Sequence, residues 1–530
     1  HAFYFLPYTG PATGFGEMPY EFSNAQRLGA IFCLYTSVIT WFYAIGSIVR
    51  LVQNPYFQQA LNERNFAKNV KRIVGPYVIL CGFGDTGSLL ARGLSDAGMP
   101  AVIIEGDEAR LKALGLRNYR VPMPGLCADA SVPKHLIEAG LQQPNCKAVV
   151  AITNNEEVNF KIAAIARLLN PSVGIITLSK VDVYEETLAT LGRNVHIVDP
   201  FKTFAQVFTA SMNNPGFYVF NTWLVGAPGA SLAQSLSPPR GKWVICGFGR
   251  MGHEVQEVLE ENHLPASVID PHAFQNGKGV DKYIVGRTTA KTLLDAGIED
   301  AVGILVGTND DGHNLGILLN ARALNPNLFS IVRQNRHENE VAFNAANADM
   351  IMQPSLVTAR RILFLLIAPL LKRFFRYLLE PKPGRQELMA DVIEKLRVSF
   401  GREKPQLITI FIDEMTSKAV VEQLDRRSSV LLGDILRDPR LRERELKVMP
   451  FVIQSGSEIT VLPENEYRLK KGDQILFCGT EGALRMLTAT LKNEYALHYV
   501  RTGTFKPRGY FMQWYSNRHD KEARQKGAAS

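Results

Sequence analysis

A duplicated order of strands, glycine turns and acidic residues constrains the fold of this chain more than any other feature. In the first copy, an apolar run at 77–81 leads into the segment Gly82-Phe83-Gly84-Asp85-Thr86-Gly87. In the second copy, the run at 243–246 leads into Gly247-Phe248-Gly249-Arg250-Met251-Gly252. A further apolar run ends in an acid 23 positions after the first glycine of each copy (82 to 105 and 247 to 270). This alternation of strands and helices predicts two α/β domains, each built on a parallel sheet.

The two copies also correspond position by position beyond this segment. Asp129 of the first copy stands where the second has Arg287, and Thr153-Asn154 corresponds to Thr308-Asn309. Asp129 is a candidate contact to a ribose or a metal ion, and Arg287 is a candidate partner for a phosphate. A surface salt bridge is the alternative for each of these two residues. The two copies are therefore not expected to carry equivalent sites.

The glycine loops predict nucleotide sites. The first glycine allows a tight turn, the second lets the backbone approach a pyrophosphate, and the third lets helix and strand pack closely. The N-terminus of the following helix then binds the anion. A carboxylate at the end of the next strand, Glu105 or Asp270, can accept both hydroxyls of an adenosine ribose and repels a 2′-phosphate. We predict that NAD or another adenine nucleotide binds here rather than NADP; a fold that binds nothing is the alternative.

A membrane helix is expected near the start of the chain. Leu28 to Val49 contains no Asp, Glu, Lys or Arg, and a helix of this length crosses about 30 Å of hydrocarbon. Gly46 is a candidate gating hinge, with close helix packing as the alternative. The basic residues that follow place the downstream part in the cytoplasm. Because the chain begins with His1, we expect that an earlier part with another membrane helix is missing.

A short glycine loop precedes this helix. Thr13, Gly14, Phe15 and Gly16 lie in the stretch that leads to it. Glycines can hold backbone carbonyls in conformations closed to other residues, and four such loops around an axis can replace the water shell of a potassium ion. The loop and the helix together have the geometry of a pore.

Composition excludes several other classes of protein. The net charge of +8 is modest for 530 residues, and no surface rich in basic and aromatic residues indicates nucleic-acid binding. The six cysteines are scattered without a Cys-x-x-Cys pair, so neither a zinc site nor a disulfide framework is indicated. Asp310-Asp311-Gly312-His313 has some metal-ligand character, but we interpret these as solvated loop residues. No pair of nucleophile and base stands out, so we do not expect an enzyme.

Together these features resemble prokaryotic potassium channels with two tandem RCK domains, also called TrkA-N or KTN domains. The resemblance runs from the glycine loop through both α/β folds to a TrkA-C-like region. It implies a homotetramer that lies in the lipid of the cell inner (plasma) membrane. Each subunit would be a multi-pass membrane protein with a large cytoplasmic C-terminal region. Eight RCK domains would form a gating ring whose ligands pull on the inner helices.

By this resemblance, the backbone carbonyls of 13–16 line the selectivity filter for K+, which passes passively. Ala12 stands where the family usually has threonine, whose hydroxyl completes the innermost ion site. A nucleotide would gate the ring, with a divalent cation such as Ca2+ as a further ligand.

The expected fold class is a pore helix and inner transmembrane helix, two Rossmann-like domains and a small α+β domain. An apolar helical arm, buried against a partner, is expected after each Rossmann-like domain. The expected boundaries are 1–52 for the pore loop, filter and inner helix, 53–75 for a basic linker, 76–226 for the first RCK domain with its arm, 227–241 for a linker, 242–384 for the second RCK domain with its arm, 385–500 for the TrkA-C-like domain and 501–530 for a tail.

Two alternative functions stay open at this stage. A peripheral NAD-binding regulator of a potassium transporter, of the TrkA type, would share the duplicated cytoplasmic domains but lack the membrane helix. An NAD-dependent oxidoreductase would need a substrate site with a general acid, which the sequence does not indicate.

Overall fold

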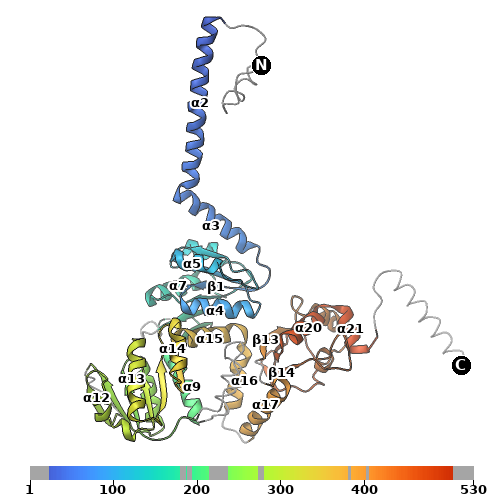
Figure 1. Ribbon diagram of the computed structural model, residues 1–530. Helices are drawn as coiled ribbons and strands as arrows, with labels where there is room; N and C mark the ends of the chain where they lie inside the picture. Colours follow the sequence, from blue (N-terminus) through green and yellow to red (C-terminus); the bar gives the residue numbers. More distant parts are fainter. Residues whose placement is uncertain are drawn as a thin grey trace, which may run out of the picture.

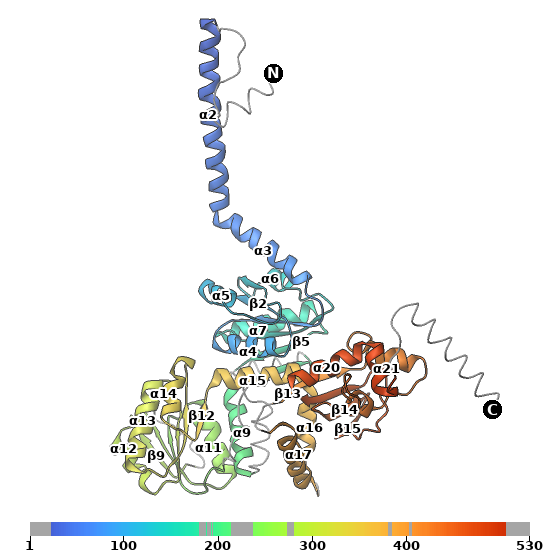
Figure 2. The ribbon, with the colours of Figure 1, turned by 45° about the vertical axis from the view of Figure 1, so that its right-hand side comes forward.

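The computed structural model of the chain describes residues 23–179, 187, 192, 194–213, 237–272, 280–379, 384–401 and 405–504. A long helix, α2 (Asn24–Gln53), is followed by two parallel α/β domains and a smaller α+β domain. In Figures 1 and 2, α2 projects away from the folded part of the chain.

Helix α2 is apolar around its whole circumference. Its segment Ile31–Gln53 is long and apolar enough to cross a membrane, with a mean hydropathy of 1.6. Phe32, Phe42 and Tyr43 are 70%, 68% and 76% exposed. A helix with large bare side chains on every side needs lipid or other helices around it. The helix is continuous through Gly46, and no other atom lies within 4 Å of the position that a Cβ would take there.

The segment after α2, indicated by the sequence only as a polar connection, is largely helical. Helix α3 (Pro55–Lys71) begins at Asn54, whose side chain accepts a hydrogen bond from the Tyr56 N–H at 2.9 Å. Phe66 and Val70 are buried in the core of the first domain. These two side chains are four residues apart and therefore share one helix face. Helix α3 thus fixes the end of α2 to the first α/β domain.

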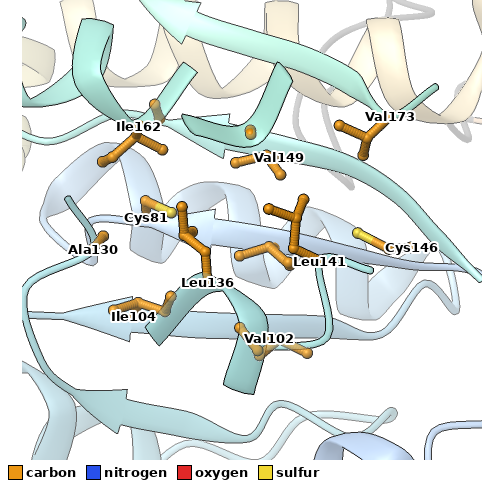
Figure 3. Close-up of a cluster of buried hydrophobic side chains, with 14 of the residues drawn as sticks. Cys81, Val102, Ile104, Ala130, Leu136, Leu141, Cys146, Val149, Ile162 and Val173 are labelled. Atoms are coloured by element: carbon orange, nitrogen blue, oxygen red, sulfur yellow. The ribbon is translucent and has the colours of Figure 1, made fainter. Parts of the chain in front are cut away.

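The first domain is a six-stranded parallel sheet in the order β3-β2-β1-β4-β5-β6. This order, with its reversal between β1 and β4, is that of dinucleotide-binding folds. Figure 3 shows the buried apolar side chains on one face of this sheet, among them Cys81, Val102 and Leu136. The strands are β1 (Tyr77–Cys81), β2 (Ala101–Glu105), β3 (Gly125–Cys127), β4 (Cys146–Ala151), β5 (Gly174–Leu178) and β6 (Val195–Val198), and the helices are α4 (Asp85–Asp96), α5 (Glu108–Gly115), α6 (Pro133–Glu138) and α7 (Glu156–Leu169).

The second domain repeats this topology strand for strand, in the order β12-β11-β10-β7-β8-β9. The duplication predicted from the sequence is therefore confirmed in the fold. The strands are β7 (Trp243–Cys246), β8 (Ala266–Asp270), β9 (Lys282–Val285), β10 (Gly303–Val306), β11 (Phe329–Arg333) and β12 (Met350–Met352), and the helices are α11 (Arg250–Glu261), α12 (Ala290–Asp295), α13 (Asp311–Leu324) and α14 (Glu340–Ala345).

The two domains exchange their following helices. Helix α9 (Pro200–Asn213) follows the first domain but packs on α11 of the second, where Phe208 is fully buried. Helix α15 (Pro354–Ile367) follows the second domain but packs on α4 of the first, where Ile362 is fully buried. The described parts of the two expected apolar arms thus pack within this chain, whereas a partner was expected to cover them; residues 214–226 of the first arm lie outside the described residues. Each domain core depends on a helix that is connected to the other domain.

The C-terminal unit is an antiparallel sheet in the order β13-β16-β14-β15. Phe374 of α16 stacks on Phe451 of β14 with ring centroids 5.1 Å apart, so the second half of the arm covers this sheet. In both views this unit and the second domain lie on opposite sides of α15 and α16. The elements are α16 (Pro369–Leu379), α17 (Arg385–Phe400), β13 (Gln406–Phe411), α18 (Lys418–Asp425), α19 (Leu432–Ile435), β14 (Val448–Ser455), β15 (Glu458–Val461), β16 (Gln474–Gly479), α20 (Glu481–Lys492) and α21 (Glu494–Thr502).

Candidate functional site

The predicted glycine loops lie at the carboxyl ends of β1 and β7. Gly82 and Gly247 adopt φ values of +105° and +92°, a region that side chains disfavour. The loops run directly into α4 and α11, whose N-termini present free N–H groups. Both loops therefore have the strand–turn–helix geometry that binds phosphate in dinucleotide-binding folds.

The other glycines of the loops serve two different purposes. A Cβ on Gly87 would collide with the Gly82 carbonyl oxygen, and a Cβ on Gly252 would collide with that of Gly247. The third glycine of each loop is therefore required for close packing of helix against turn. At Gly249 no atom lies within 4 Å of the Cβ position, so this backbone is open to a ligand.

Gly87→Ala is expected to lower the free energy of unfolding by about 1–3 kcal/mol, because the methyl group meets backbone that cannot move aside. Denaturation of the full-length chain, followed by circular dichroism, measures the change. Gly115→Ala, at the end of α5 with open space around it, is the matched control. Equal effects of the two substitutions would contradict the packing role of Gly87.

The acids at the ends of β2 and β8 hold the glycine loops in shape. Glu105 accepts hydrogen bonds from the backbone N–H groups of Phe83 and Asp107. Asp270 accepts from Phe248 N–H at 2.7 Å and from His272 N–H at 2.8 Å. Each carboxylate thus lies directly beside its loop, as the spacing predicted. Each carboxylate oxygen keeps a lone pair with which it can accept a ribose hydroxyl.

A buried asparagine in each copy fixes the loop after the fourth strand, and the sequence reasoning missed it. The Asn159 side chain accepts from Thr153 N–H and O–H and donates to the carbonyls of Thr153 and Leu178. Asn314 makes the same four contacts with Thr308 and with the Arg333 carbonyl. The available signal was an asparagine six positions after the threonine in both copies.

Asp129 and Arg287, which differ in charge, lie at equivalent positions of the two domains. Ala128 N–H donates to the Glu105 carbonyl, and Gly286 N–H donates to the Asp270 carbonyl, so the residues that follow correspond. The hydrogen bond from the Ser131 N–H, at 2.8 Å, lowers the pKa of Asp129 despite partial burial. Arg287 is exposed and lines a cavity.

The second copy contains a cavity of about 750 Å³ at its glycine loop, which is large enough for a nucleotide. Most of the residues predicted for the second site line this cavity: Gly247, Phe248, Gly249, Arg250, Asp270, Arg287, Thr308 and Asn309. The other two predicted residues, Met251 and Gly252, are buried in α11. Phe201 and Arg333 also line it and were not predicted. Phe201 comes from α9, so the cavity has a wall from outside its own domain.

Of the residues at the start of α13, Asp311 is buried, and its interpretation as a solvated loop residue was wrong. It accepts hydrogen bonds from Asn335, Arg336 and Asn339. Burial opposes ionisation, but these hydrogen bonds outweigh it and lower the pKa of Asp311. Asp310 caps α13 by accepting from the His313 N–H. Within the described ranges, no three His, Cys, Asp or Glu side chains are grouped so as to hold a metal ion.

The predicted filter residues Thr13, Gly14, Phe15 and Gly16 lie outside the described residues. Asp85 and Thr86 lie in the first turn of α4, with Asp85 exposed, and Asn154 is exposed at the end of the loop after β4. In the first loop, the Cβ position of Gly84 lies 3.5 Å from an Arg110 side-chain nitrogen.

Comparison with known proteins agrees with this architecture. Residues 78–199 and 243–354 match the model of the TrkA-N domain. Probable potassium channel protein 2 and potassium channel protein 1 of Methanocaldococcus jannaschii are 26% and 24% identical over 259 and 251 residues. These alignments cover 48% and 46% of this chain and 67% and 65% of those proteins.

A protein of Methanothermus fervidus is 26% identical over 293 residues, which are 51% of this chain and 45% of that protein. The chain thus spans about half to two thirds of the length of these curated relatives. A solved structure of the GsuK channel bound to NAD has the same fold, with a TM-score of 0.50, 16% identity and 92% of each chain covered. Residues 78–199 and 243–354 are therefore two TrkA-N domains, and the chain is similar to proteins named as potassium channels.

Proposed function

We propose that this chain is a subunit of a potassium channel gated by nucleotide. The observation that carries the proposal is the direct connection of the apolar helix α2, through the docked helix α3, to tandem TrkA-N domains with a nucleotide-sized cavity. Relatives named potassium channel proteins support it. In this proposal four subunits surround a pore in the plasma membrane, and residues 13–16 form its filter.

The exchange of helices between the two domains supports a gating role. A ligand that changes the second domain acts on α9, and therefore on the first domain, from which α3 leads to α2. A ligand gates only to the extent that it binds one state of the ring better than the other. NAD or an adenine nucleotide is the proposed ligand of the glycine-loop sites, and Ca2+ is a further candidate.

Flux of K+ into liposomes that hold the full-length protein tests the proposal. We expect flux that changes when NAD or ADP is added to the side of the TrkA-N domains. Absence of K+ flux under every nucleotide and divalent cation would overturn the channel function.

The peripheral regulator remains the second candidate, because TrkA-type proteins share the duplicated domain; a TrkA homologue of Pyrococcus horikoshii is 25% identical over 167 residues. The bare apolar surface of α2 favours the channel. Extraction of the protein from membranes by high salt alone would favour the regulator. Hydride transfer between NAD and a substrate would instead favour an oxidoreductase.

Glu105→Ala is expected to weaken nucleotide binding at the first site by about tenfold or more, because the carboxylate accepts from the loop and is placed for the ribose. Calorimetric titration of the full-length protein with NAD and ADP measures the change. Glu108→Ala is the matched control, since this exposed glutamate forms an ion pair with Lys112 across one helical turn. Unchanged affinity in Glu105→Ala would contradict the ribose assignment.

A further inference from the structure

The two glycine-loop sites carry opposite charges at equivalent positions. Asp85 and Arg250 are the first residues of α4 and α11, directly after the second glycine of each loop. Asp129 follows Ala128, whose N–H donates to the Glu105 carbonyl. Arg287 follows Gly286, whose N–H donates to the Asp270 carbonyl. The third pair is Leu178 and Arg333, whose carbonyls both accept from the buried asparagine. Three arginines thus stand where the first copy has two acids and a leucine.

All three arginines line one cavity. The guanidinium carbons of Arg250 and Arg333 lie 4.5 Å and 5.0 Å from the centroid of the Phe201 ring. Cation–π attraction to one buried ring holds both groups at the same wall without neutralising them. Burial, with the nearby charge of Arg250, lowers the pKa of Arg333. The charges of Arg250 and Arg333 therefore repel each other, and an anion between them would remove that repulsion.

The acids near the cavity are occupied by other partners. Asp270 accepts from the Phe248 and His272 backbone, and Asp311 accepts from residues 335, 336 and 339. The Nε of Arg333 is buried without a hydrogen-bond partner within the described part of the chain. The arrangement therefore offers several donors and a net positive charge to a ligand.

We propose that the second site binds a nucleoside di- or triphosphate, with its terminal phosphate at Arg250, Arg287 and Arg333, whereas the first site does not select for such a phosphate. The inference rests on the nucleotide binding of the proposed function. A terminal phosphate carries about two negative charges and three acceptor oxygens, which arginine recognises with paired N–H groups. NAD lacks this group, and Asp270 repels the 2′-phosphate of NADP. In the first copy, Asp85 at the start of α4 opposes an additional phosphate charge.

Calorimetric titration of the full-length protein with ATP, NAD and NADP, in detergent, tests the proposal. The variant is Arg250→Gln with Arg287→Gln; both side chains are exposed, so the core is unaffected. Arg240→Gln with Lys291→Gln is the control, because it removes the same charge from two exposed positions outside the cavity, one just before the second domain and one within it. We expect ATP affinity to fall at least about tenfold in the variant and less than about threefold in the control.

Equal losses in variant and control would overturn the inference, as would ATP affinity unchanged by the variant. The inference would also be overturned if the wild-type protein bound NADP more tightly than ATP and the variant lost this NADP binding. In each of these outcomes the channel proposal stands, because K+ flux is measured separately. If the wild-type protein binds no nucleotide, the inference and nucleotide gating fail together, while K+ flux still decides the pore.

Discussion

Phe208→Ala is expected to lower the free energy of unfolding by about 3–5 kcal/mol, the usual cost of removing a fully buried phenyl ring. Phe208 has no exposed surface, and its ring packs edge-on against Trp243 with centroids 5.6 Å apart. Because α9 follows the first domain, this contact joins the two domains. The substitution should therefore also weaken nucleotide binding at the second cavity, whose wall includes Phe201 of the same helix.

Denaturant titration and calorimetry on the same preparation separate the two effects. Ile362→Ala is the reciprocal substitution, since Ile362 of α15 is fully buried against the first domain. It should destabilise the chain by about 2–5 kcal/mol and leave the second cavity intact. Leu168→Ala, at an 81% exposed position, is the control and should have little effect. A Phe208→Ala protein as stable as this control would contradict the exchange of helices.

Local geometry at the glycine loops could be predicted from sequence because it depends on neighbours in the chain. The turn at Gly82 and the close packing at Gly87 follow from the absence of a Cβ within a six-residue segment. The position of Glu105 beside its loop follows from parallel pairing of two strands that adjoin in the sheet. The binding roles of these residues stay predictions.

Contacts between distant segments could not be predicted in this way. Phe201 and Arg333 meet although 132 positions separate them (201 to 333), and no periodicity relates a helix start to a strand end. Asp311 was wrongly interpreted as solvated because its hydrogen-bond donors lie at 335–339, in a loop that the sequence does not bring near it. Asn314 was missed because an asparagine in an amphipathic helix is usually exposed.

Asn314→Ala is expected to destabilise the second domain by about 2–4 kcal/mol, because several polar groups of Thr308 and Arg333 would lose their partner inside the protein. Thr308 lines the cavity, and Arg333 supplies one of its guanidinium groups. Nucleotide affinity should fall as well, since both residues are positioned through Asn314. Asn344→Ala, at an exposed position of α14, is the control. Denaturant titration and calorimetry again measure both effects.

Asn314→Asp separates hydrogen bonding from side-chain size. The two side chains have nearly the same shape, but the carboxylate would place an oxygen against the carbonyls of Thr308 and Arg333, which now accept from the amide nitrogen. We therefore expect a loss of stability close to that of Asn314→Ala. Protonation restores one donor to the aspartate, so the difference between variant and wild type should shrink on acidification. A variant as stable as wild type at neutral pH would show that Asn314 fills space and does not position the loop through its donated hydrogen bonds.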